Sequence, residues 1–153
     1  MFQIFSSLVA LGGLTAWAVC PATPSCPGSL TVCIDVVAPP GAVNINAADL
    51  LNRFVLFGPG GDPTLRVQRP GGGVTWTVTA QVTSVTPVSI SSNALQIKDQ
   101  GGTFQDGGAL ITIHQNNIDC EEFIVEHRLD LADLGDRTSG ETLVFIVEYT
   151  VTE

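Results

Sequence analysis

Apolar and polar residues alternate most regularly over residues 74–82. The side of the extended backbone expected to face a core carries Val74, Trp76, Val78, Ala80 and Val82. Threonine and glutamine residues occupy the opposite side. A period of two predicts a strand with one face on a core and the other in water.

Shorter runs of strand-like sequence recur along the chain, separated by turns rich in Gly, Pro, Asn and Asp. They occupy residues 30–36, 53–57, 64–68, 85–90, 94–98, 109–114, 123–129 and 142–151. No amphipathic helix of ten or more residues is visible, and only residues 46–51 suggest a helical turn, capped by Asn46. Eight or nine short strands predict an all-β fold, a single antiparallel β-sandwich of immunoglobulin-like or jelly-roll-like type.

The last predicted strand is apolar on both faces. Its inward positions are Leu143, Phe145, Val147, Tyr149 and Val151. Val144 and Ile146, on the opposite face, are apolar as well. Such a strand is either central in the sandwich beneath a loop or covered by another chain.

Residues 1–19 carry no charged side chain, and the first basic residue is Arg53. As a strand, this segment places Phe2, Ile4, Leu8, Ala10, Leu14 and Ala16 on one face. As a signal peptide, it has an apolar centre at residues 8–14 and a small-residue cleavage site at 16–18, but it lacks a basic start. As a membrane span, it is long enough, but glycines and polar residues dilute it and no basic residue flanks it.

Four cysteines indicate an oxidising compartment and two disulfides, because three of them cluster near a Pro-rich segment, residues 20–29. The four allow three connectivities, of which we expect Cys20–Cys26 and Cys33–Cys120. A metal site at Cys20, Cys26 and Cys33 is the alternative, but their spacing does not match the close cysteine pairs of zinc sites.

Length and charge limit the number of domains and the classes of partner that the chain can have. A chain of 153 residues is most simply one domain with a real core. Only 14% of its residues are charged, against the roughly 25% usual in soluble proteins, so part of the surface is expected to be uncharged or covered by other subunits. A formal charge of −9 argues against binding to nucleic acid or anionic lipid.

Two groups of residues resemble metal sites. His114, Asp119, Glu122 and His127 are suitable zinc ligands, but their spacing follows no known ligand pattern. Loop oxygens that would suit calcium lie at Asp99, Gln100, Asp106, Asp130, Asp133 and Asp136. They lack the spacing of an EF-hand loop, and ordinary turns are rich in Asp and Gly, so we expect no bound metal.

No catalytic motif is present. The chain has no nucleophile elbow, phosphate-binding loop with a lysine, or zinc-protease motif. Glu121 and Glu122 are adjacent, so on a strand they point to opposite faces. We therefore expect no enzymatic activity, no cofactor and no small-molecule substrate.

An apolar arm at residues 1–19, a Pro-rich hinge at 20–29 and a small acidic sandwich at 30–153 resemble the subunits of secreted, pilus-like filaments that assemble by donor-strand complementation. In that family an N-terminal strand enters a neighbour's sandwich. The resemblance implies a homopolymer at the cell surface that meets a membrane only during export. The implied interface residues are Phe2, Ile4, Phe5, Leu8, Ala10, Leu14, Val144 and Ile146.

Two other functions fit the same features. One is a virion protein that decorates or cements a capsid and holds a neighbour with its apolar arm. The other is a secreted β-sandwich binding module whose residues 1–18 are removed as a signal peptide.

Overall fold

The computed structural model describes residues 2–8, 26, 30–45, 49–71, 73–134 and 142–153, and in 2–8 only the backbone. These residues form an all-β, sandwich-like fold with twelve strands in three sheets. The predicted all-β, sandwich-like fold class is thus confirmed, although the strands number twelve in place of the eight or nine expected.

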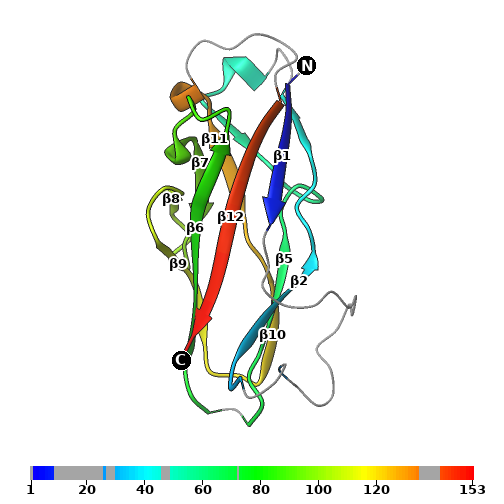
Figure 1. The fold of residues 1–153 in the computed structure, drawn as a ribbon, viewed down its shortest axis with the longest axis vertical. Coiled ribbons are helices and arrows are strands. Elements are labelled where there is room, and N and C mark those ends of the chain that lie inside the picture. Colours follow the sequence, from blue (N-terminus) through cyan, green and yellow to red (C-terminus); the bar gives the residue numbers. More distant parts are fainter. Residues whose placement is uncertain (1, 9–25, 27–29, 46–48, 72, 135–141) are drawn as a thin grey trace.

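The front sheet has five strands in the order β3-β1-β12-β6-β9. Their bounds are β1 Phe2–Leu8, β3 Val43–Ile45, β6 Trp76–Thr86, β9 Ile111–Asn116 and β12 Thr142–Thr152. All neighbours are antiparallel except β1 and β12, which run parallel. Figure 1 shows both of these strands pointing the same way along the long axis of the molecule.

Two smaller sheets lie behind the front sheet (Figure 1). The lower back sheet has the order β10-β5-β2, with bounds Cys120–Ile124, Thr64–Gln68 and Cys33–Ala38. The upper back sheet has the order β4-β11-β7-β8, with bounds Phe54–Leu56, His127–Asp130, Leu95–Lys98 and Phe104–Asp106. Only Val125 and Glu126 separate β10 from β11, and backbone bonds from Val125 to Pro63 and from Lys98 to Glu126 link the two sheets. The two sheets therefore make one interrupted layer.

Short 3-10 helices complete the described fold: η1 Asp49–Leu51, η2 Ser92–Ala94 and η3 Leu131–Leu134. The first of them, η1, covers the second half of residues 46–51, where the sequence suggested a helical turn. Asn46, its suggested cap, lies outside the described residues.

The core lies between the two layers and follows the period-two pattern. On β6, Trp76, Val78 and Ala80 are fully buried, and on β12 Leu143 and Phe145 are fully buried. The Trp76 indole donates a hydrogen bond to the carbonyl oxygen of Ile118 at 2.9 Å, which satisfies its polar group in the core.

Three sequence expectations need correction. Val74 does not join the buried face of β6, because the strand begins at Trp76 and Val74 remains 47% exposed. The predicted strand at 85–90 is wrong for most of its length, since β6 ends at Thr86 and residues 87–90 form a turn. The predicted strand at 123–129 is instead split between β10 and β11, whose break at Val125 and Glu126 divides the back layer.

Candidate functional site

The feature most relevant to the predicted arm is the position of β1 inside the front sheet. β1 pairs with β12 from Gln3 opposite Thr142 to Leu8 opposite Val147, and with β3 from Phe2 opposite Ile45 to Ile4 opposite Val43. The first strand of the chain is thus hydrogen-bonded on both sides and is not an edge strand. We call the space between β3 and β12 the arm slot.

Register relates the two faces of the arm to the core. Ile4 lies beside Leu143 and Leu8 beside Val147, and both residues of β12 are fully buried. Neighbouring Cα partners in a sheet project to the same face, so the even positions of β1 fall on the core side. Phe5 lies beside Val144, on the outer face.

The predicted interface residues divide into three groups. Phe2, Ile4, Phe5 and Leu8 lie on β1, for which the structure describes the backbone alone. Ala10 and Leu14 lie outside the described residues. Val144 and Ile146 lie on β12 beside the arm and are partly buried.

The disulfides differ from the expected pairing. Cys26 is bonded to Cys33, so the predicted Cys20–Cys26 and Cys33–Cys120 pairs are wrong. Cys120 is also disulfide-bonded, and Cys20 lies outside the described residues. Cys33 and Cys120 both lie opposite Gln68, on the two sides of β5. Two strand spacings separate their backbones by about 9–10 Å, which is too far for a disulfide.

A buried hydrogen-bond relay connects β12 to the back layer. The Tyr149 hydroxyl lies 3.0 Å from Nε2 of His127, and Nδ1 of His127 lies 3.3 Å from Oδ1 of Asp62. The same carboxylate oxygen accepts the backbone N–H of His127 at 2.8 Å. Burial raises the pKa of the Tyr149 phenol, and the negative charge of Asp62 raises it further. The relay therefore holds a protonated phenol against a buried imidazole.

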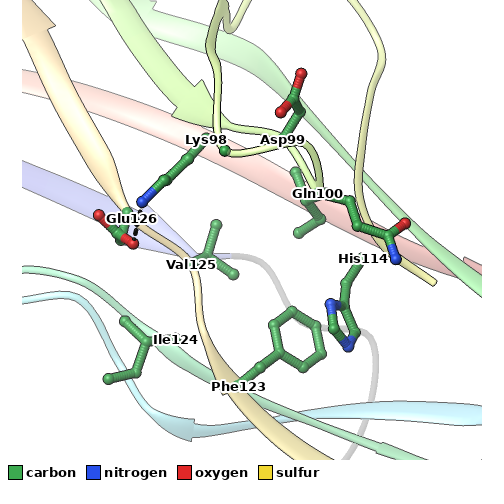
Figure 2. A pocket seen from close by; sticks show the side chains of 10 residues that line it. Lys98, Asp99, Gln100, His114, Phe123, Ile124, Val125 and Glu126 are labelled. Carbon is green, nitrogen blue, oxygen red and sulfur yellow. Dashed lines mark hydrogen bonds and ion pairs between the residues drawn. The ribbon is translucent and has the colours of Figure 1, made fainter. Parts of the chain in front are cut away.

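A cavity of about 360 Å³ opens between β9, the turn after β7 and the segment that joins β10 to β11 (Figure 2). At one side the Lys98 ammonium is paired with the Glu126 carboxylate at 2.6 Å. At the other side the ring of Phe123 stacks on His114, with 4.3 Å between ring centroids.

The polar groups around this cavity bind one another. Nε2 of His114 lies 2.9 Å from Glu121, and the Gln100 amide donates to the carbonyl oxygen of Gln115 at 3.1 Å. The Asp99 carboxylate accepts bonds from the Thr103 backbone and the Gln105 side chain. Since these groups are already paired, the cavity offers a ligand little beyond apolar contact.

The histidines and carboxylates considered for zinc are not brought together. His114 pairs with Glu121, His127 pairs with Asp62, and Glu122 pairs with Arg66 on the other face of β10. Within the described parts of the chain, no three His, Cys, Asp or Glu side chains are grouped so as to hold a metal ion. Glu121 and Glu122 point to opposite faces, as predicted.

The acidic loops considered for calcium serve local contacts. Asp99 caps its own turn, Asp106 accepts a bond from Gln96 at 2.9 Å, and Asp130 binds Arg53 at 3.0 Å. The Arg53 pair raises the pKa of the guanidinium, chiefly through the hydrogen bond to Asp130. Asp133 adds a smaller electrostatic contribution there, and Asp136 lies outside the described residues.

Sequence reasoning missed two buried polar pairs. Asp62 lies 65 residues from His127, and Arg66 lies 56 residues from Glu122. Pairing of β5 with β10 makes the Arg66 contact, and the turn before β5 brings Asp62 to His127. Nothing local in the sequence marks either contact. The one available signal was the arginine at position 66, between Leu65 and Val67 in a predicted strand, because a buried arginine implies an acidic partner.

No protein-family model matches the chain, and no curated protein matches it either. A search of the described residues found no helix long and apolar enough to span a membrane. The Cys26–Cys33 bond is consistent with an oxidising environment.

Proposed function

We propose that the chain is a structural subunit of an extracellular filament, and that its N-terminal arm completes the sandwich of a neighbouring subunit. The supporting observation is the position of β1. This strand occupies an internal place in the front sheet, and its partners β12 and β3 come from distant parts of the sequence. A strand that pairs only with sequence-distant neighbours can be exchanged between copies, because the incoming strand makes identical bonds.

The arm has the reach for exchange. Seventeen residues separate Leu8 from Cys26, which the disulfide ties to β2. Fully extended, such a segment spans at most about 60 Å. A domain of this length has a radius of gyration of only about 15 Å, so the arm of one subunit can enter the slot of the next.

The slot supplies both affinity and register for an incoming strand. Main-chain bonds on two sides give binding energy, and alternating side chains select the register. The core-side positions of β1 lie beside Leu143, Phe145 and Val147, which are fully buried. Without an arm, the edge of β12 beside these residues would be open.

The test is a polar substitution at a core-side position of the arm. Ile4→Asp should produce folded, soluble monomers, because a carboxylate entering beside Leu143 would be buried without a partner. Gln3→Asp, on the neighbouring position, is the matched control and should still assemble. Electron microscopy gives filament length, and circular dichroism gives folding. Filaments of normal length from Ile4→Asp would refute the proposal.

A further inference from the structure

The outer face of the front sheet is almost without charge, and we call it the front face. Glu148 is the one Asp, Glu, Lys or Arg residue in the five strands of this sheet, whereas the chain has six basic and fifteen acidic residues. Roughly a quarter to a third of the positions on an ordinary soluble surface are charged. Depletion of charge is instead typical of the centres of protein interfaces.

Neutral polar side chains fill the front face in regular rows. Trp76, Val78 and Ala80 are buried in the core, so the residues between them on β6 point outward. Register aligns the outward residues in rows across β12, β6 and β9, with Thr150, Thr79 and Thr112 in one row and Thr152, Thr77 and Gln115 in the next. Within the second row the Gln115 amide donates to the Thr77 hydroxyl at 3.2 Å. The face is therefore an array of hydroxyl and amide groups.

The front face is open in the single chain. Thr112, Glu148 and Thr150 are exposed. Figure 1 shows β12 toward the viewer, with no described strand or helix drawn over it. Val144 and Ile146, on the part of β12 that pairs with the arm, add apolar side chains that are only partly buried. A partner can approach this face directly.

The size of the front face suits a contact between two copies of the chain. Its strands have three to eleven residues. Strands lie about 4.8 Å apart and rise about 3.3 Å per residue, so the face covers about 600 Å². Two copies packed front to front bury about 1,200 Å², which is the low end of the range for stable, specific interfaces. Sheets pack face to face in the same way inside β-sandwiches.

The chemistry of the face also favours a second copy. A two-fold contact joins the same surface on both copies, so that surface must be complementary to itself. Hydroxyl and amide groups both donate and accept hydrogen bonds, so an array of threonine and glutamine meets this requirement. A strongly charged partner would need the opposite charge on the face, which is absent. Contact through the front faces brings only Glu148 of each copy toward the other, although each copy carries a formal charge of −9.

We propose that two copies of the chain pack front face to front face. The contact goes beyond the proposed function, because it joins subunits side by side and does not use arm exchange. An interface at the low end of the size range is weak, so pairing appears only in concentrated protein. Neutral groups hold the contact while the like net charges of the two copies oppose it, so it tightens as salt rises.

The experiment uses the full-length chain with its arm locked in its own slot. Gln3 and Thr142 are Cα partners at the start of β12, so Gln3→Cys with Thr142→Cys allows a disulfide between arm and slot. This parent is oxidised at high dilution, and denaturing, non-reducing electrophoresis shows that the bond lies within one chain. A locked arm cannot be exchanged, so self-association of the parent reports on the front face whether or not the proposed function holds. Analytical ultracentrifugation up to about 1 mM should show dimers, more of them at high salt.

Thr150→Asp and Thr79→Asp, each added to the parent, place a carboxylate from both copies in the contact. Each should weaken pairing at least about tenfold, because like charges then meet where no basic residue is present. Thr31→Asp is the matched control, since Thr31 is exposed and precedes β2 in the lower back sheet, and it should leave pairing unchanged. Circular dichroism checks that all variants fold.

Three results would overturn the inference in favour of a different occupant of the front face. The first is a parent that stays monomeric at about 1 mM. The second is pairing that weakens as salt rises, because that dependence indicates ion pairs. The third is pairing of Thr150→Asp and Thr79→Asp within about twofold of Thr31→Asp.

Discussion

Tyr149 should keep its phenolic proton in the folded protein well above the pH at which a free tyrosine loses it. Burial is the main cause of the raised pKa, and the Asp62 carboxylate is the second. Since Nδ1 of His127 faces this carboxylate, Nδ1 carries the proton of the neutral imidazole, and Nε2 accepts from the Tyr149 hydroxyl. Ionising the phenol would break this bond and place two negative charges near one histidine.

The magnitude follows from proton linkage. The ordinary pKa of the phenol is 10.0. Above it the unfolded chain has lost the proton and the folded protein has kept it, so the folded state binds more protons. The free energy of unfolding therefore falls by about 1.4 kcal/mol for each pH unit, until the raised pKa of the folded state is reached. Below the ordinary value the contribution is fully present.

Two assays test this reasoning. The chain contains one tyrosine, so phenolate absorbance reports on Tyr149 alone. The folded protein should show no phenolate at about pH 11, while the urea-unfolded chain should be mostly ionised. In urea denaturation, the free energy of unfolding of Tyr149→Phe should not show this steep fall with pH above the ordinary pKa of tyrosine. At neutral pH the variant should be about 1–3 kcal/mol less stable, because Nε2 of His127 loses its partner. A normal phenolate midpoint in the folded protein would refute the account of the relay.

Two further stability predictions concern the core and the disulfide. Phe145→Ala should lower the free energy of unfolding by about 3–5 kcal/mol in urea denaturation, because the ring is fully buried. Val144→Ala, at the partly buried neighbouring position, should cost clearly less, and equal losses would contradict the assigned faces of β12. Replacing Cys26 and Cys33 together by serine should cost about 2–3 kcal/mol, because their bond closes a short loop. Thermal denaturation checks this, and an unchanged midpoint would show that the bond does not constrain the unfolded chain.

The strands were predictable where one face of a strand meets the core. Alternation in β6 and β12 gave both the element and its buried side, because side chains on a strand project alternately to the two faces. β3 and β8 have three residues each, too few for a period to be visible. Their place comes from pairing with longer neighbours.

The path of the first strand was not predictable from the sequence alone. Its apolar pattern suited a strand, a signal peptide or a membrane span, and each of these would place the segment in different surroundings. Parallel pairing of Phe2–Leu8 with Thr142–Thr152 joins the two ends of the chain. No local pattern encodes so distant a contact.

The cysteine pairing and the buried polar pairs could not be predicted from the sequence for a related reason. Counting cysteines indicated disulfides, but the choice of partners depends on register. β5 lies between Cys33 and Cys120 and prevents them from meeting. Likewise, the position of the turn before β5 decides that His127 meets Asp62.

The most direct test of arm exchange is a cross-link between the arm and β12. Ser7 and Ile146 are Cα partners across the parallel pair, and adjacent strands lie about 4.8 Å apart, within disulfide range. A chain with Ser7→Cys and Ile146→Cys is assembled, oxidised and separated on a non-reducing gel, beside each single variant. If the arm enters a neighbour, the double variant gives a ladder of covalently linked subunits that neither single variant gives. Assembled filaments that run only as cross-linked monomers would contradict the account.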